Sequence, residues 1–452
     1  MRIHFIAIGG SAMHNLAIAL KLKGYDITGS DDEIFEPSLS RLRKHQILPE
    51  AIGWDPDKIS KDLDAVVLGM HARNDNPELI RAKEIGVKIY SYPEYLYEQT
   101  KDKIRIVVGG SHGKTTITSM IMHVLKFSGK KFDYMVGAQL EGFENMVSLN
   151  HDTTIAVFEG DEYLTSPIDL RPKFHLYQPN IALISGIAWD HINAFPTYRE
   201  YVEQFSLFIK KIVPGGSLVY NSEDNEVARL VESNANGIHT IPYSTHPYLF
   251  GEGIAYLKVD SKRVPLAVFG KHNMQNINGA KNVCNLVGIQ DEIFYQAIST
   301  FRGASKRLQL LAENNTTKVF LDFAHSPSKV AATIQAVKEA FPNRKLVACL
   351  ELHTFSSLTA EFLSQYNETM NHSDLAIVYY NPHTIEHKKL QPITTGDVEK
   401  AFGYPKPKVY TDSQLLVDEL KKEGWENKNL LIMTSGNFSG INLPELAKEI
   451  AS

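Results

Sequence analysis

Cysteine is almost absent from this chain of 452 residues, which contains only Cys284 and Cys349. Neither has a CxxC partner and they lie far apart, so a disulfide framework and a cysteine zinc site are excluded. Long hydrophobic runs are also missing, since no apolar stretch approaches the length that crosses a bilayer. The first residues lack the basic region, apolar stretch and cleavage site of an export signal, so we expect a cytoplasmic protein.

Strong charge of either sign is lacking too. The chain has 47 Lys and Arg against 52 Asp and Glu, a formal net charge of −5, and no block of like charges. This balance argues against a dedicated nucleic-acid binder. We therefore expect small-molecule partners, no nucleic acid and no membrane span, while the sequence leaves open whether the protein is a monomer or a homodimer.

Short apolar runs alternate with helical patterns along the whole chain, which predicts an α/β protein. The length exceeds what one core usually organises, so two to four domains are expected. We predict strands at residues 3–8, 25–28, 65–68 and 87–90, then 154–158, 181–184 and 217–220, and finally 318–322, 346–350, 375–379 and 430–434. A polar segment at 98–103 is predicted to be a linker, and a further boundary follows residues 301–303.

The most informative stretch is residues 109–116, GGSHGKTT, which follows an apolar run at 104–108 and precedes a helical pattern. A glycine-rich turn between a strand and a helix aims backbone N–H groups and the helix dipole at one point, which suits a phosphate. Lys114 can reach terminal phosphates, and the Thr115 hydroxyl can ligate a magnesium ion that bridges them. Val108 stands where the Walker pattern has its first glycine, so the pattern alone would miss this site. The strand before the turn and the helix after it nevertheless predict that ATP or GTP binds here. The alternative is a plain connecting turn.

Acidic residues follow the next predicted strand. The segment 159–163, EGDEY, comes directly after the apolar residues 155–158, so at least one carboxylate is expected at the sheet edge that carries the phosphate loop. Magnesium prefers oxygen ligands. We predict that Glu159, nearest the strand end, completes a magnesium site with Thr115, the alternative being an acidic surface turn.

Three further groups of residues could meet the nucleotide. His191 follows Asp190 just after the strand at 181–184. A histidine beside an aspartate at a strand end can be an oriented ligand or a general base. The alternative is that Asp190 is a helix cap. Asn276 lies in a segment rich in amide side chains, whose donors and acceptors suit the hydrogen-bonding edge of adenine. The alternative is that these residues only form turns and helix caps. Arg307 and Asp322 follow the boundary after residues 301–303 and could reach the nucleotide from there.

A second phosphate site is predicted near the start of the chain. Gly9 and Gly10 follow the first strand, and Asp31 ends the second, where a Rossmann fold places a pyrophosphate and a ribose hydroxyl. The full GxGxxG pattern is absent, and an ordinary turn with an incidental acid is the alternative. We favour binding because the glycine pair precedes a helix N-terminus that can hold a phosphate.

Taken in order, GGSHGKTT, EGDEY, the segment 180–191, GKHNMQN and LDFAHSP resemble the signature of the Mur ligases, the ATP-dependent enzymes that build or rebuild the peptidoglycan precursor. The resemblance covers essentially the whole chain. It implies an N-terminal Rossmann-like UDP-binding domain at 1–102, a central P-loop ATPase-like domain with a mostly parallel sheet at 103–304, and a C-terminal Rossmann-like domain at 305–452 that binds an amino acid or peptide.

Within the family, the opening HFIAIGGSAM and Asp31 resemble the members that act on UDP-N-acetylmuramate. One branch of these adds L-alanine, and the other, the murein peptide ligases of cell-wall recycling, adds the tripeptide L-alanyl-γ-D-glutamyl-meso-diaminopimelate. Residues 33–42, 160–174 and 433–441 resemble the recycling branch. Several other members carry a carbamylated lysine at the position where this chain has Phe205. That lysine is also missing in both muramate-specific branches. Other departures from the family pattern, none of which removes an apparent ligand, are Ala12, Ile117, Gly160 and Asn193.

The resemblance also implies site roles, with ATP as co-substrate and Mg²⁺ as cofactor. Catalytic roles fall to Lys114, His191 and Arg307. The nucleotide would be held by Gly110, Ser111, His112, Gly113, Lys114, Thr115, Thr116, Asn276, Arg307 and Asp322. Magnesium would be held by Thr115, Glu159 and His191. The UDP group would be held by Gly10, Ser11, Ala12, Met13 and Asp31.

Two other classes of protein remain open from the residues alone. The Rossmann-like first hundred residues also suit a nicotinamide dehydrogenase, although a second phosphate site counts against it. Phosphate loops also occur in nucleotide-binding switches, which release phosphate alone. A ligase differs from both because it needs its two co-substrates before ADP appears.

Overall fold

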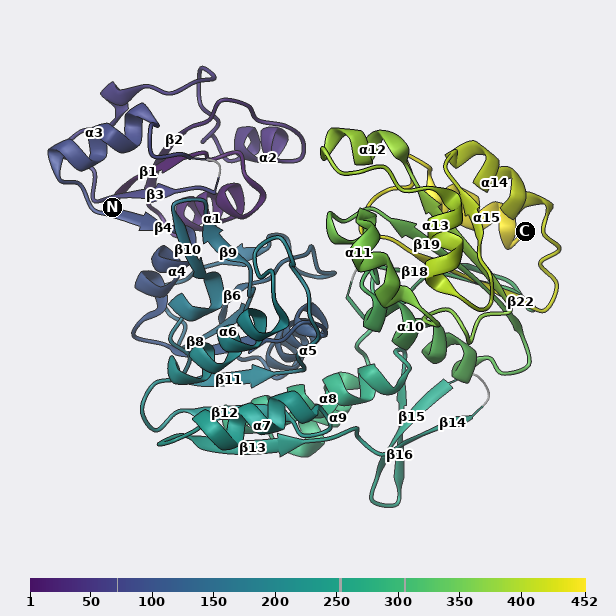
Figure 1. Cartoon of the computed structure of the whole chain (residues 1–452). Coiled ribbons are helices and arrows are strands. Elements are labelled where there is room, and N and C mark those ends of the chain that lie inside the picture. Colours follow the sequence, from purple (N-terminus) through teal and green to yellow (C-terminus); the bar gives the residue numbers. More distant parts are fainter. Residues whose placement is uncertain (71, 252–253, 305) are drawn as a thin grey trace. The chain divides into compact units, whose positions relative to one another are not determined.

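The computed structural model describes residues 1–70, 72–251, 254–304 and 306–452 (Figure 1). The chain divides into two compact units, each described here by itself. The first comprises Met1–Ile187, Tyr198–Ser244 and Gly279–Phe294, and the second comprises Ala188–Thr197, Thr245–Asn278 and Tyr295–Ser452. Helices connect mostly parallel strands in both units, so the predicted α/β class is confirmed.

The first unit begins with a four-stranded parallel sheet in the order β2-β1-β3-β4. Its strands are β1 (Arg2–Ile6), β2 (Asp26–Ser30), β3 (Ala65–Leu68) and β4 (Ile89–Ser91), and its helices are α1 (Ser11–Leu22), α2 (Ser38–Lys44), α3 (Pro77–Ile85) and α4 (Tyr92–Thr100). The predicted alternation of strands and helices is confirmed in this part of the chain. The predicted linker at 98–103 is wrong in part, because α4, stabilised by a capping box between Ser91 and Glu94, continues to Thr100.

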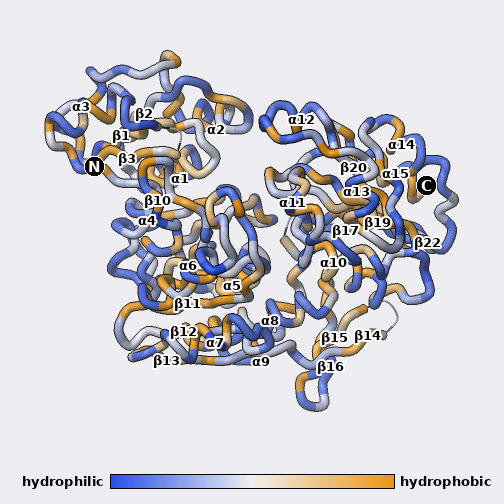
Figure 2. The backbone as a smooth tube through the Cα atoms, in the orientation of Figure 1, coloured by the Kyte–Doolittle hydropathy of each residue, from blue (hydrophilic) through white to orange (hydrophobic). Residues whose placement is uncertain are grey.

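A seven-stranded sheet forms the rest of the first unit, in the order β13-β12-β11-β5-β8-β6-β7, with only β7 antiparallel. Among its inner strands, β11 is a continuous apolar run, as expected for a strand buried on both faces, and Figure 2 shows this. The strands are β5 (Ile104–Gly109), β6 (Asp133–Met135), β7 (Val147–Ser148), β8 (Ile155–Glu159), β11 (Ile181–Ile184), β12 (Ser217–Asn221) and β13 (His239–Tyr243), and β9 (Leu164–Ser166) and β10 (Asp169–Pro172) form a separate hairpin.

Helices α5 (Lys114–Phe127), α6 (Tyr198–Lys210), α7 (Asn225–Asn234) and α9 (Asp291–Ile298) accompany this sheet in the chain, and α8 (Lys271–Leu286) continues from the second unit into the first. Because β5 lies between β11 and β8, the loop after β5 opens at the middle of the carboxyl edge. Ligands of open α/β sheets bind at this edge.

The second unit contains an antiparallel sheet, β14 (Tyr248–Gly251), β15 (Ile254–Val259) and β16 (Lys262–Leu266), which we did not predict. It also contains a six-stranded sheet in the order β17-β18-β22-β19-β20-β21, parallel except for β17. These strands are β17 (Gln309–Glu313), β18 (Lys318–Asp322), β19 (Lys345–Leu352), β20 (Leu375–Tyr380), β21 (Lys408–Tyr410) and β22 (Lys428–Met433).

Helices cover both faces of the six-stranded sheet, as β19 shows. Leu346, Ala348 and Leu350 belong to the core cluster that includes buried residues of α10 (Pro327–Ala340), α11 (Ala360–Leu363) and α13 (Thr395–Phe402). Val347 and Cys349, which point the other way, belong to the cluster with α14 (Ser413–Lys422) and α15 (Leu443–Ile450). This alternation is the doubly wound arrangement predicted for the C-terminal part.

Within the described ranges, no helix combines the length and the apolar character needed to cross a membrane. Both cysteines are buried and unbridged. Burial raises the pKa of each thiol, so neither carries the thiolate that reactive cysteines need.

Candidate active site

The loop between β5 and α5 is shaped by close backbone contacts that only glycine permits. Gly110 has φ of +132°, and a Cβ there would lie 2.1 Å from the Ser185 hydroxyl oxygen. On the other side of the loop, a Cβ on Gly186 would lie 2.4 Å from the His112 ring. The Ser111 N–H donates to the Gly186 carbonyl at 3.0 Å. The loop is therefore fastened to the chain that follows β11.

Helix α5 begins at Lys114, directly after Gly113, which adopts the left-handed conformation with φ of +78°. Within the described chain, no side-chain hydrogen bond caps this helix, whereas α3, α4 and α7 of the same unit each begin with one. The N–H groups of its first turn, including those of Thr115 and Thr116, have no acceptor within the helix itself. An uncapped N-terminus behind a glycine-rich loop is a ready site for an anion.

Lys114 is held at the mouth of the loop by one hydrogen bond and one ion pair. Its Nζ donates to the Gly110 carbonyl at 2.6 Å and lies 2.7 Å from Oε2 of Glu162. Burial would lower the pKa of Lys114, but the charges of Glu162, Asp161 and Glu159 outweigh it and raise the pKa. The ammonium therefore stays charged, as binding to terminal phosphates requires.

Glu159, at the end of β8, lies beside the first turn of α5 as predicted. The Thr115 hydroxyl donates to Glu159 Oε1 at 2.7 Å, and the Gly137 N–H donates to Oε2 at 2.8 Å. The juxtaposition follows from the pairing of Val108 with Glu159 in adjacent parallel strands. Threonine and carboxylate oxygens are the hard donors that Mg²⁺ prefers, so this pair fits the ion.

No three His, Cys, Asp or Glu side chains gather to hold a metal ion anywhere in the described part of the chain. A magnesium ion at Thr115 and Glu159 would thus take its remaining ligands from phosphate oxygens and water, as this ion commonly does.

The N-terminal sheet carries the second predicted site. Residues 10–13 form the start of α1, with Gly10 as its N-terminal cap residue and with Ser11, Ala12 and Met13 in the first turn. Asp31 accepts the Gly9 N–H at 2.6 Å, and a Cβ on Gly9 would lie 2.9 Å from the same carboxylate oxygen. Burial raises the pKa of Asp31 to about 6. The sequence thus brings Asp31 and the α1 N-terminus together.

Asp190 and His191 belong to the second unit. The Asp190 carboxylate accepts the His191 N–H at 2.8 Å and lies 3.4 Å from Lys329 Nζ of α10. Burial would raise the pKa of Asp190, but the Lys329 ammonium is foremost among the charges that lower it well below its usual range. No helix begins here, so the helix-cap interpretation of Asp190 is wrong. The metal role of His191 stays a prediction.

The remaining predicted nucleotide contacts also lie in the second unit. Asn276 is buried in the middle of α8, so its interpretation as a turn or cap residue is wrong. Asp322 accepts the Leu308 and Ala324 N–H groups, each at 2.7 Å, and the Arg307 guanidinium stacks 4.7 Å from the Phe323 ring centre. Asp322 therefore fixes the turn that carries Arg307, while contact with a nucleotide stays a prediction.

Sequence reasoning missed Glu162, which lies three residues after Glu159 and is completely buried. The only signal was its place in the acidic segment 159–163. A buried carboxylate is costly unless it is paired, so its contact with Lys114 marks it as part of the site.

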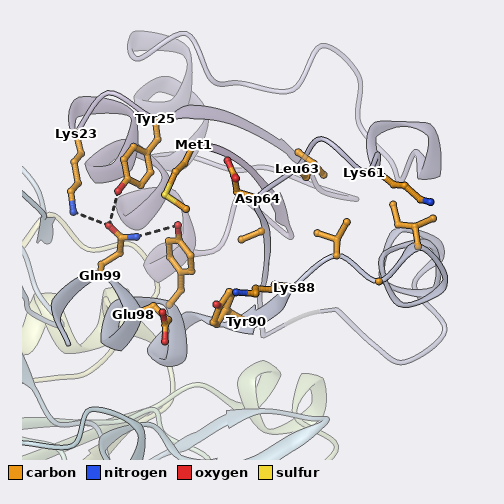
Figure 3. Close-up of a pocket in the computed structure, with 15 residues that line it drawn as sticks. Met1, Lys23, Tyr25, Lys61, Leu63, Asp64, Lys88, Tyr90, Glu98 and Gln99 are labelled. Carbon is orange, nitrogen blue, oxygen red and sulfur yellow. Dashed lines mark hydrogen bonds between the residues drawn. The ribbon is translucent and has the colours of Figure 1, made fainter. Parts of the chain in front are cut away.

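A cavity of about 830 Å³ lies elsewhere in the first unit, at the amino ends of the N-terminal strands (Figure 3). Gln99 joins three of its other side chains: it accepts hydrogen bonds from Lys23 at 2.8 Å and Tyr25 at 3.3 Å, and donates to Tyr95 at 3.2 Å. The cavity lies at the edge opposite to the predicted ligand sites, and we assign it no part in the reaction.

Comparison with known proteins decides the family. Three family models match successive parts of the chain: "Mur ligase family, catalytic domain" at residues 2–103, "Mur ligase middle domain" at 108–284 and "Mur ligase, glutamate ligase domain" at 306–436. The chain belongs to the Mur ligase family. Mur ligases are ATP-dependent enzymes that form amide bonds in peptidoglycan synthesis, so the predicted enzyme class is confirmed. A nicotinamide dehydrogenase and a nucleotide-binding switch are excluded.

Similar proteins include both muramate-specific branches of the Mur ligases. A UDP-N-acetylmuramate–L-alanine ligase of Caldicellulosiruptor bescii is 31% identical, covering 83% of this chain and 82% of the relative. A UDP-N-acetylmuramate–L-alanyl-γ-D-glutamyl-meso-2,6-diaminoheptandioate ligase of Haemophilus influenzae is 27% identical, covering 99% and 98%. Among solved structures, a murein peptide ligase of Psychrobacter arcticus has a TM-score of 0.65 at 21% identity, covering 100% of this chain and 99% of its own. This last likeness shows the shared fold.

Proposed function

We propose that this Mur ligase joins the tripeptide L-alanyl-γ-D-glutamyl-meso-diaminopimelate to UDP-N-acetylmuramate, at the expense of ATP. Support comes from the Haemophilus influenzae tripeptide ligase, which matches nearly the whole length of both chains. Residues 33–42, 160–174 and 433–441, which resemble the recycling branch, support the same donor. The reaction would return a recovered peptide to the peptidoglycan precursor.

One observation carries the ATP chemistry of this proposal: Lys114, Thr115 and Glu159 meet at the N-terminus of α5. An ammonium, an uncapped helix N-terminus and an oxygen pair that fits Mg²⁺ surround the same loop. Such a group of charges suits phosphoryl transfer, in which catalysis is mainly positioning and electrostatic stabilisation.

In the proposed reaction, an oxygen of the lactyl carboxylate attacks the γ-phosphorus of ATP. The bond between this phosphorus and the oxygen that bridges the β- and γ-phosphates breaks, and ADP leaves. The α-amine of the tripeptide then attacks the carbonyl carbon of the acyl phosphate and loses a proton. The carbon–oxygen bond breaks, and phosphate leaves with one oxygen of the original carboxylate.

The side chains of the loop have separate tasks in this reaction. Lys114 neutralises the β- and γ-phosphates, and the N–H groups of the α5 first turn bind phosphate oxygens. Thr115 and Glu159 would hold a magnesium ion, which supplies positive charge against the repulsion between the carboxylate and the phosphates. Gly10–Met13 and Asp31 bind the UDP group of the acceptor.

L-Alanine is the second candidate donor, and the 31% identical relative from Caldicellulosiruptor bescii favours it. The two donors share the attacking amine, an L-alanyl α-amine, so the chemistry at Lys114 is the same for both. They differ in what lies beyond the first residue, which only a donor comparison can distinguish.

The test offers the purified protein ATP, Mg²⁺ and UDP-N-acetylmuramate, with L-alanine and with the tripeptide in parallel, and follows ADP release. The proposal predicts that kcat/KM for the tripeptide exceeds that for L-alanine by at least about 100-fold, since a site built for the polar groups of one substrate strongly rejects the analogue that lacks them. Activity with L-alanine and none with the tripeptide would overturn the donor assignment and leave the ligase chemistry intact. A reaction without any amine serves as the control for ATP hydrolysis.

A further inference from the structure

Glu162 and Tyr201 form a buried pair behind the phosphate-loop lysine. We propose that Glu162, fixed by Tyr201, is a positioning residue that orients the Lys114 ammonium toward the terminal phosphates of ATP. This inference rests on the ATP site of the proposed function and is independent of which amine donor the enzyme uses.

The geometry at Lys114 leaves its ammonium little freedom. The group has three N–H donors. Glu162 Oε2 lies 2.7 Å from Nζ, and the Gly110 carbonyl accepts at 2.6 Å. The carbonyl takes one of these donors and the carboxylate holds the ammonium by its charge, so the position of Nζ is restricted from two sides. The Lys114 side chain keeps 15% of its surface exposed, whereas that of Glu162 has none.

Tyr201 fixes the other oxygen of Glu162. The hydroxyl of Tyr201, a residue of α6, donates to Glu162 Oε1 at 3.0 Å. Its ring is fully buried and packs edge-on against Phe205, with the two ring centres 5.3 Å apart. The two carboxylate oxygens thus have different partners, one in α6 and one in the phosphate loop. A chain of direct contacts therefore runs from the core of the first unit to the ammonium.

The acidic segment 159–163 divides its carboxylates between separate tasks. Glu159 contacts Thr115 and Gly137, where a metal ion fits, and Asp161 pairs with Lys173 at 2.6 Å in a partly exposed position. Glu162 forms the ion pair with Lys114. A buried charge is expensive to keep, and an apolar side chain of similar volume commonly does as well for stability alone. A positioning role accounts for a charge at this place.

The test compares Glu162→Gln and Tyr201→Phe with the wild type, and uses Asp133→Asn as the matched control, because Asp133 is a buried carboxylate of the same sheet that pairs with Lys103 away from the phosphate loop. Affinities for ATP and AMP with Mg²⁺ are measured by calorimetry, and kcat by ADP release. For Glu162→Gln we expect about tenfold weaker ATP binding and a kcat lower by about 10-fold to 100-fold, the range typical of residues that orient a functional group. Binding of AMP, which lacks terminal phosphates, and of UDP-N-acetylmuramate stays within twofold.

For Tyr201→Phe we expect ATP affinity and kcat each to fall roughly threefold, with AMP binding unchanged, since a single hydrogen bond is lost. Asp133→Asn stays within about twofold of the wild type in every measurement.

A double-mutant cycle with Lys114→Ala decides whether Glu162 acts through the lysine. In the Lys114→Ala background, adding Glu162→Gln should change ATP affinity by less than twofold. An undiminished tenfold effect in that background, or equal weakening of ATP and AMP, overturns the proposal. If Glu162→Gln does not fold, the cycle with Tyr201→Phe decides by the same criteria. Wild-type protein that binds ATP but uses neither amine donor contradicts the proposed function and leaves this inference standing.

Discussion

Single side chains around the phosphate loop each meet one chemical requirement. Lys114 supplies charge, Thr115 and Glu159 supply hard oxygens, and Glu162 holds the lysine. The first three were predictable because a strand, a glycine-rich turn and a helix fix where their side chains point. Glu162 was not, because the irregular turn after β8 has no period from which the direction of a side chain follows.

Asp31 gives a pH-dependent prediction. Burial raises the pKa of its carboxyl to about 6 in the free protein, so lowering the pH through 6 protonates a group that we expect to accept a hydrogen bond from the UDP ligand. Affinity for UDP-N-acetylmuramate should fall by up to about tenfold between pH 7 and pH 5, the worth of a hydrogen bond to a charged group. Calorimetric titrations across this range measure the effect.

Asp31→Asn should bind more weakly at pH 7 and show no such pH dependence, whereas Asp57→Asn, which removes an exposed carboxylate of the same part of the chain, should behave as the wild type. Wild-type affinity that is constant from pH 5 to 7 would refute the assigned role.

Whole elements were predictable where burial is complete. The strands β3, β11 and β18 match their predicted bounds, since parallel strands buried on both faces are continuous apolar runs. The antiparallel strands β14, β15 and β16 were missed, because their faces are only partly buried and Lys258, Lys262 and Arg263 interrupt the apolar pattern. In such short strands the partner across the sheet, rather than the local sequence, decides the structure.

The phosphate loop gives a prediction at the level of an element. Gly110→Ala places a Cβ 2.1 Å from the Ser185 hydroxyl at φ of +132°, a conformation that side chains rarely adopt. We expect the free energy of unfolding to fall by roughly 2–3 kcal/mol and ATP affinity to fall at least about tenfold. Gly129→Ala at the other end of α5 is the control, because at φ of +73° it meets nothing within 4 Å and should cost only about 1 kcal/mol.

Denaturant unfolding and ATP titration of both variants measure these effects. Normal ATP binding by Gly110→Ala would show that the loop does not need the conformation described.

On the scale of the whole molecule, contacts between residues far apart in the sequence decide to which unit a segment belongs. Residues 188–197 lie between strands of the first unit in the chain, yet they pack with the second unit, where Asp190 meets Lys329. Nothing in the local sequence indicates this, because Lys329 lies 139 residues further along the chain. The three predicted domain ranges, 1–102, 103–304 and 305–452, accordingly stay a prediction.

Removing Lys329 should release this segment. Lys329→Met leaves the Asp190 carboxylate, only 15% exposed, without its nearest ammonium, which is costly for a buried charge. We expect amide hydrogen exchange in residues 188–197 to become about tenfold faster, with α5 unaffected. Lys338→Met, which breaks a more exposed ion pair on the same helix, should change neither region. Equal exchange in both variants would contradict the anchoring role.

The transfer of an ATP phosphate to a carboxylate is the central claim, and oxygen labelling tests it most directly. UDP-N-acetylmuramate carrying ¹⁸O in both carboxylate oxygens is turned over with ATP, Mg²⁺ and the amine donor that proves active, and the released phosphate is analysed by mass spectrometry. The account predicts one ¹⁸O atom in each phosphate and the other in the amide product. Phosphate without ¹⁸O, formed at the rate of amide synthesis, would contradict it.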